Sequence, residues 1–164
     1  ERMHDGIVQE FSVAENLVLQ DYDHAPISRS IFLNFAAIAQ RGRELVADFN
    51  IRTPSIETST RSLSGGNIQK LILARELSRN PKVLVAAQPT RGVDIGATEY
   101  IHQRLLDQRA QGTATLLISE DLDEILALAD RIAVIYEGRI MDIVPREQAT
   151  AERLGLLMAG VTEG

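Results

Sequence analysis

The chain has 164 residues, of which 17 are Lys or Arg and 23 are Asp or Glu, so its formal net charge is −6. A hydrophobic content of 45% excludes intrinsic disorder, and the absence of cysteine excludes disulfide frameworks, thiolate metal sites and thiol catalysis. The acidic balance argues against nucleic acid as a partner, because phosphate binding needs a basic surface.

The N-terminal third is predicted to be helical. Ser12 and Glu15 match a capping box, so a first helix should run from Val13 towards Gln20. A second, amphipathic helix is predicted from an apolar stripe with helical spacing: Phe35, Ile38, Leu45, Val46 and Phe49. The Ser- and Thr-rich segment 53–64 then fits neither a helix nor a strand and is predicted to be a loop.

Helices and short apolar runs alternate in the rest of the chain. We expect, in order, a helix that stops before Asn80, a buried strand over 82–87, a helix over 97–111 capped by Gly112, a buried strand over 113–119, a helix over 122–129, and two strands, 132–136 and 139–144, joined by a turn at Glu137-Gly138. This order predicts an α/β fold with a mostly parallel sheet. We therefore divide the chain into an N-terminal helical subdomain, 1–62, and an α/β part, 63–164.

Leu63-Ser64-Gly65-Gly66-Asn67 stands at the predicted start of a helix. The first backbone N–H groups of a helix point out of its N-terminus and favour an anion there. The two glycines would let a phosphate approach closely, and the Ser64 hydroxyl could donate to it. The alternative is an ordinary Ser-capped helix start with a flexible glycine pair.

Four further motifs follow this string: 83–94 (VLVAAQPTRGVD), 117–121 (LISED), 129–132 (ADRI) and 137–140 (EGRI). In this order and spacing they resemble the second half of an ATP-binding cassette (ABC) ATPase. Segments 5–8, 12–17 and 156–160 extend the resemblance, which is closest to the second of two tandem cassettes in importers of simple sugars or nucleosides. The resemblance implies a partial P-loop NTPase core with an N-terminal helical subdomain.

The chain departs from the family pattern where the family carries out hydrolysis. The family has Asp-Glu at the end of the first core strand, for Mg²⁺ and the attacking water, and this chain has Ala87 and Gln88. Glu120 stands where the family has a histidine that reaches the γ-phosphate. The phosphate-binding Gly-rich loop with its lysine is absent from these residues. We therefore expect no catalytic residues and no ATP hydrolysis by this chain alone.

In the family, each nucleotide lies between the Gly-rich loop of one cassette and the Ser-Gly-Gly signature of the other. The resemblance thus implies that Ser64, Gly65, Gly66 and Asn67 bind ATP held by a partner cassette. Asp94 resembles a residue at the cassette interface; the alternative is that it caps the helix near Gly96, and it could do both at the same time. ATP and Mg²⁺ are the expected cofactors of the intact parent protein, and none is expected to bind tightly to this chain.

By resemblance, the chain is the C-terminal piece of a tandem subunit that lies peripherally on the cytoplasmic face of the inner membrane. Its partners would be the upstream cassette of the same polypeptide and a membrane permease, the latter contacted through the helical subdomain. Ile27, Ile31 and Phe32 are candidates for that contact, with core packing as the alternative.

The string Ala87-Gln88 before Pro-Thr-Arg-Gly favours a nucleoside importer. Apolar faces meant for the missing half predict self-association of the isolated chain.

Two other functions stay open at this stage. One is a soluble ABC protein of translation or DNA repair, which the net charge disfavours. The other is a structural cassette remnant that binds no nucleotide. His4, His24 and His102 are scattered and predict no metal site, and the acidic stretch 120–124 is predicted to be the solvated first turn of a helix.

Overall fold

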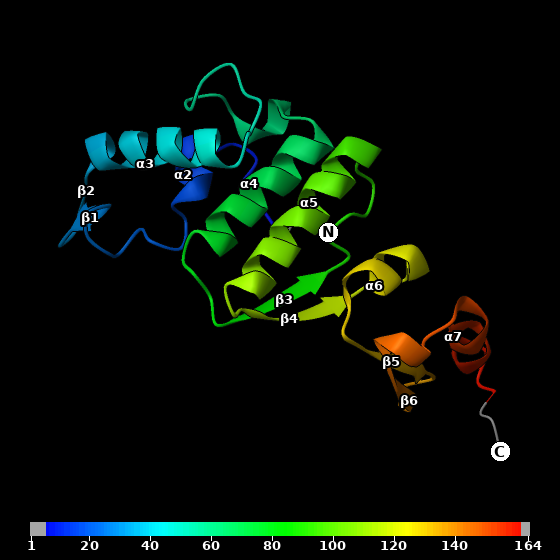
Figure 1. The fold of residues 1–164 in the computed structure, drawn as a ribbon. Helices are drawn as coiled ribbons and strands as arrows, with labels where there is room; N and C mark the ends of the chain where they lie inside the picture. The colour runs from blue at the N-terminus through cyan, green and yellow to red at the C-terminus, as the bar shows by residue number, and fades with distance from the viewer. Residues whose placement is uncertain (1–5, 162–164) are drawn as a thin grey trace.

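A computed structural model describes residues 6–161 of the chain. Its elements, labelled as in Figure 1, are α2 (Val13–Leu17), β1 (Ser28–Arg29), β2 (Phe32–Leu33), α3 (Phe35–Asp48), a 3₁₀ turn (Thr60–Ser62), α4 (Gly65–Leu77), β3 (Val83–Ala87), α5 (Ile95–Ala110), β4 (Ala114–Ile118), α6 (Leu122–Leu128), β5 (Arg131–Tyr136), β6 (Arg139–Pro145), a second 3₁₀ turn (Arg146–Gln148) and α7 (Ala151–Met158).

The capping box at the start of α2 is confirmed. The Ser12 hydroxyl accepts the Glu15 N–H at 3.2 Å, and the Glu15 carboxylate accepts the Ser12 N–H at 2.8 Å. The helix ends at Leu17, however, and the predicted continuation to Gln20 is wrong. The chain there forms successive tight turns, in which the N–H of Asp21 donates to the carbonyl of Val18.

Helix α3 is confirmed, but its predicted apolar stripe is wrong at one end. Ile38 and Leu45 are buried, whereas Phe35, the first residue of the helix, is 72% exposed. It follows directly after a short antiparallel hairpin, β1–β2, which the sequence did not predict. This hairpin lies at the far end of the helical layer from α5 (Figure 1).

Strands β3 and β4 form the expected parallel pair, with α5 as the crossover helix between them. The expectation that both strands are buried is wrong. Helices α4 and α5 lie over one face (Figure 1), and Leu84 packs into the core there. On the opposite face, side chains at alternate positions are at least half exposed: Val83, Val85, Leu116 and Ile118. No described element covers that face.

The C-terminal elements form a second, smaller unit. Strands β5 and β6 pair antiparallel through the predicted turn, where Glu137 and Gly138 have φ of 47° and 77°. Positive φ at both turn residues is typical of a tight hairpin whose twist matches its strands. Helix α7 packs on this hairpin, and the Arg153 guanidinium pairs with the Asp142 carboxylate at 3.0 Å. The parallel arrangement therefore holds for β3 and β4 but not for the two hairpins.

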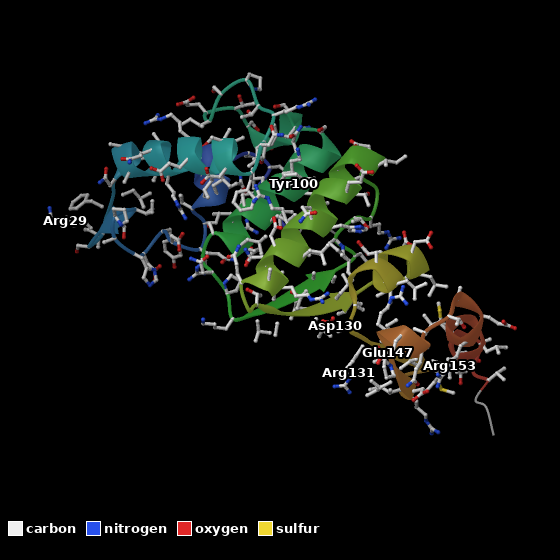
Figure 2. All side chains as sticks on the ribbon, in the orientation of Figure 1. Arg29, Tyr100, Asp130, Arg131, Glu147 and Arg153 are labelled. Atoms are coloured by element: carbon white, nitrogen blue, oxygen red, sulfur yellow. The ribbon has the colours of Figure 1, made fainter. Side chains whose placement is uncertain are left out.

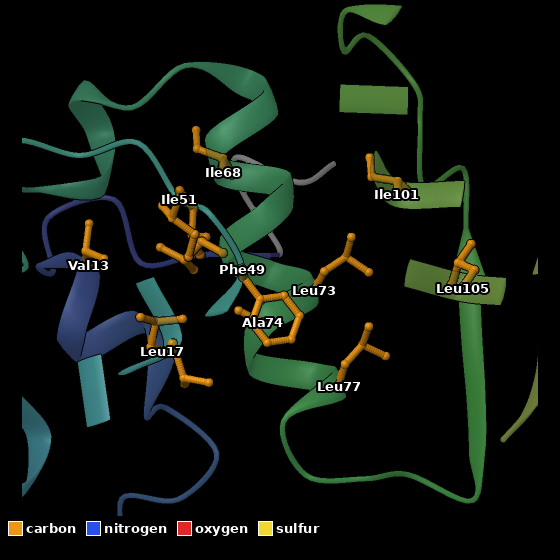
Figure 3. Close-up of a cluster of buried hydrophobic side chains, with 13 residues drawn as sticks. Val13, Leu17, Phe49, Ile51, Ile68, Leu73, Ala74, Leu77, Ile101 and Leu105 are labelled. Carbon is orange, nitrogen blue, oxygen red and sulfur yellow. The ribbon is translucent and has the colours of Figure 1, made fainter. Parts of the chain in front are cut away.

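The largest buried cluster joins helices from both predicted parts of the chain (Figure 3). Its members come from α2, the end of α3 and the residues just after it, α4 and α5: Val13, Leu17, Phe49, Ile51, Ile68, Leu73, Ala74, Leu77, Ile101 and Leu105 among others. The predicted boundary at residue 62 thus runs through a shared core and stays a prediction. No helix within residues 6–161 is both long enough and apolar enough to span a bilayer.

Candidate functional site

The signature segment, Ser64–Asn67, forms the start of α4. Ser64 is the N-cap residue, but its side chain makes no capping bond to the helix backbone. Instead, the Asn67 side-chain amide donates to the Ser64 hydroxyl oxygen at 2.9 Å. Ser64 is therefore the N-cap residue, as the alternative expects, but its side chain does not cap the helix. The N–H groups of Gly65, Gly66 and Asn67 have no acceptor among the described residues, which leaves them free for an anion in front of the helix.

Asn67 is held at both ends of its amide. Its oxygen accepts the backbone N–H of Arg52 at 2.8 Å, in the segment that follows α3. Its nitrogen is used by Ser64, as described above. The side chain therefore joins the signature segment to the helical layer. In this arrangement the Asn67 amide orients Ser64, and contact of Asn67 with a nucleotide stays a prediction.

Gly66 and Asp94 lie side by side. A Cβ on Gly66 would stand 3.2 Å from the Ala97 Cβ and 3.6 Å from the Asp94 Oδ2, so a side chain at this position would require the start of α5 to shift slightly. The other Asp94 oxygen accepts the Ala97 N–H at 2.9 Å, which confirms Asp94 as the N-cap of α5. The fold thus brings the signature segment together with the residue predicted at a cassette interface.

Ala87, Gln88 and Glu120 gather at the carboxyl ends of β3 and β4, which we call the strand edge. Ala87 pairs with Ile118 in the parallel register, the Gln88 N–H donates to the Ile118 carbonyl at 2.7 Å, and Glu120 follows two residues later. Gln88 has a φ of 50°, and Glu120 is exposed. At this edge a methyl group offers no ligand to Mg²⁺, and an amide cannot take a proton from water. The position of Ala87 therefore does not fit a metal ion.

Two basic side chains without a predicted role connect the end of α3 and the segment after it to α4 and α5. The Lys70 ammonium donates to the Asn50 carbonyl at 3.1 Å and lies 4.5 Å from the centre of the Tyr100 ring, which projects from α5 (Figure 2). Arg104 donates to the Asp48 carbonyl. Burial lowers the pKa of Lys70, the nearby Arg52 lowers it further, and Asp94 acts in the opposite direction. These contacts use the carbonyls at the end of α3.

Glu124 corrects the prediction for the acidic stretch. It is only 2% exposed and accepts the Thr90 hydroxyl at 2.8 Å, while its distance to the His102 Nε2 is 3.1 Å. His102, which the sequence left among scattered histidines, is thus satisfied by this carboxylate. A helix of seven residues has too few turns for periodicity to reveal which of its residues are buried.

Comparison with known proteins gives relatives along almost the whole chain. It is 51% identical over 160 residues to the nucleoside import ATP-binding protein NupA of Lactococcus lactis. This alignment covers 98% of this chain and 32% of NupA. It is 47% identical over 163 residues to the guanosine import ATP-binding protein NupO of Bacillus subtilis. This alignment covers 99% of this chain and 32% of NupO. A glucose import ATP-binding protein of Haloferax volcanii, TsgD13, is 44% identical, with 98% and 30% covered. No protein-family model matches the chain.

Solved structures agree on the fold. The dimeric cassette MJ0796 bound to ADP and Pi superposes on this chain with a TM-score of 0.70 at 21% sequence identity. The superposition covers 85% of this chain and 59% of the MJ0796 chain. The ADP form of the cassette MJ1267 gives a TM-score of 0.66 at 22% identity, with 92% and 60% covered. The described residues therefore have the ABC ATPase fold. The chain spans about a third of the length of the curated relatives it matches.

Proposed function

Since the chain has the fold of an ATP-binding cassette and homologues among the ATP-binding proteins of nucleoside and sugar importers, we propose that it forms the distal part of the second cassette of such a protein. In this role it closes over ATP bound by a partner cassette and does not hydrolyse ATP at its own strand edge. The parent would lie peripherally on the cytoplasmic face of the inner membrane. NupA and NupO favour a nucleoside as the solute.

The arrangement of the signature segment is the observation that carries this proposal. Three backbone N–H groups without an acceptor within residues 6–161 lie at the N-terminus of α4, next to the Ser64 hydroxyl. Because Ser64 accepts a bond from Asn67, its own proton is available to donate. Donors of this kind fit a triphosphate, and ATP would supply the phosphoryl group that is transferred to water. The partner cassette would bind the metal, since the position of Ala87 cannot.

The strand edge supports the second half of the proposal. A residue that takes a proton from the attacking water must be a base, and Gln88 is not one. Glu120 places a negative charge where the γ-phosphate of a nucleotide on this cassette would lie, which disfavours its binding. The chain thus retains the donors for a partner's nucleotide and lacks the groups for its own.

The experiment is ATP hydrolysis by the intact tandem protein. We expect Ser64→Arg to lower hydrolysis roughly a hundred-fold, because the long side chain fills the space in front of α4 and removes a donor. Gln111→Arg, which adds the same group at the exposed far end of α5, is the matched control and should leave hydrolysis unchanged. Full activity of Ser64→Arg would instead support a cassette remnant that binds no nucleotide.

A further inference from the structure

Glu124 is a buried carboxylate for which the proposed function has no use. Its side chain is 1% exposed. One of its oxygens accepts the Thr90 hydroxyl and lies 3.1 Å from the His102 Nε2. The other oxygen is buried and has no partner among the described residues. A buried acid with an unpaired oxygen destabilises the folded state relative to an apolar side chain of similar size. Stability alone therefore does not account for a carboxylate at this position.

The three side chains come from three different segments. Thr90 lies in the Gln88–Asp94 loop, which leaves the carboxyl end of β3 and ends at the N-cap of α5. His102 lies on α5 itself. Glu124 lies in α6, which follows β4 and Glu120. The cluster thus connects the Gln88–Asp94 loop, which follows β3, with α6, which follows β4, and both of them contact α5 through His102.

The Gln88–Asp94 loop is anchored at its start by the Gln88 N–H, which donates to the Ile118 carbonyl at 2.7 Å, and two longer backbone bonds lie within it. The Arg91 N–H donates to the Gln88 carbonyl at 3.2 Å, and the Val93 N–H donates to the Thr90 carbonyl at 3.3 Å. The bond from the Thr90 hydroxyl to Glu124 is shorter than these two, at 2.8 Å, and it links the middle of the loop to α6. Asp94, four residues after Thr90, stands beside Gly66 of the signature segment.

We infer that Glu124 is a positioning residue: through Thr90, and oriented by His102, it fixes the Gln88–Asp94 loop so that Asp94 and the signature segment are presented together to the partner cassette. The positioning itself is a property of this chain, whereas its use at the cassette interface rests on the proposed function. Glu124 touches no nucleotide in this scheme.

Hydrogen exchange on the chain itself tests the positioning. Thr90→Val removes the hydroxyl but keeps the branched shape, and we expect exchange of the Arg91 and Val93 amides to become about ten-fold faster. Amides in the middle of α4, such as that of the fully buried Leu71, should not change. Thr90→Ser should restore slow exchange. Thr115→Val is the matched control, because the buried Thr115 hydroxyl has no hydrogen-bond partner among the described residues.

A double-mutant cycle tests whether Glu124 is the acceptor that matters. Glu124→Met should speed exchange in the loop as Thr90→Val does, and the two changes together should be no faster than either one, because they break the same bond. Glu124→Gln keeps an acceptor oxygen and should remain close to the parent. Independent, multiplying effects of the two changes would overturn the inference, as would an equal acceleration of loop and α4 amides. If Glu124→Met fails to fold, the Thr90 series decides alone.

The same variants in the intact tandem protein separate the inference from the proposed function. We expect Thr90→Val to lower kcat for ATP several-fold and Thr90→Ser to restore it. If Ser64→Arg leaves hydrolysis intact, the proposed function fails, yet the exchange result still decides the positioning role. If Ser64→Arg abolishes hydrolysis while a loosened loop leaves kcat unchanged, the interface part of the inference fails by itself.

Discussion

At the residue scale, Asn67 determines what the hydroxyl of Ser64 can do. A serine at an N-cap normally accepts a backbone N–H of its own helix. Here the Asn67 amide occupies that acceptor position, and the Arg52 N–H holds the amide in place. The serine proton and the N–H groups of the first turn are left for a ligand. The contacts of the Asn67 side chain thereby leave the Ser64 proton available to donate.

Asn67→Asp tests this assignment. The carboxylate can still accept the Arg52 N–H, but it would also accept the Ser64 proton and so remove it from the phosphate. We expect ATP hydrolysis by the intact tandem protein to fall about ten-fold or more, because the added charge also repels the nucleotide. Thermal unfolding should change little, since Asn67 lies near the surface.

Asn34→Asp is the control for the new charge. Asn34 caps α3 through its side-chain oxygen, which accepts the Ala37 N–H at 3.2 Å, and a carboxylate can do the same. Its hydrolysis should equal that of the parent. Equal activity of Asn67→Asp and the parent would contradict the role given to Asn67.

At the scale of elements, the β1–β2 hairpin exposes a group of large apolar side chains. Ile31, Phe32 and Phe35 are 86%, 73% and 72% exposed, whereas Ile27 is 3% exposed and belongs to the core. Among the three residues considered for permease contact, core packing is therefore correct for Ile27 alone. Exposed apolar groups of this kind mark interaction sites.

We propose that the parent protein contacts a permease through this hairpin. Phe32→Asp should then weaken that binding roughly thirty-fold, because exposed aromatic anchors carry much of an interface's binding free energy. Co-purification with the permease subunits measures this. ATP hydrolysis without the permease should be unaffected, which separates loss of docking from loss of folding. Gln111→Asp, with the same charge on α5, should bind normally, and normal binding of Phe32→Asp would exclude the hairpin.

At the scale of the whole molecule, the described residues leave one face of β3 and β4 bare. The side chains that point there are apolar in both strands, and paired positions such as Val85 and Leu116 are 62% and 58% exposed. A continuous apolar surface on a sheet with open edges favours pairing with another chain. We therefore keep the prediction that the isolated chain self-associates.

Val85→Lys tests the surface responsible. Sedimentation of the isolated chain should show larger species with increasing concentration, and Val85→Lys should shift the distribution towards monomer, because burying the ammonium in an apolar contact is unfavourable. Gln111→Lys carries the same group away from the sheet and should behave as the parent does. A monodisperse monomer at all concentrations would contradict self-association.

Local signals in the sequence were sufficient for most elements of the fold. The capping box, the stop before Pro81, the turn at Glu137-Gly138 and the strand-helix-strand order all depend on neighbouring residues, and the structure contains each of them. The ordered motifs were also sufficient to indicate the ABC fold. Local chemistry determines such features, because capping, backbone φ and side-chain periodicity act over a few residues.

Only the tertiary structure decided which residues meet. The sequence could not show that Glu124 is buried against Thr90 and His102, that Asn67 is shared between Ser64 and Arg52, or that one face of the core strands is bare. These features depend on contacts between segments distant in the chain, and a carboxylate or an apolar strand has the same local pattern whether or not a partner covers it. Burial and pairing are properties of the packed molecule, and they decided the roles of these residues.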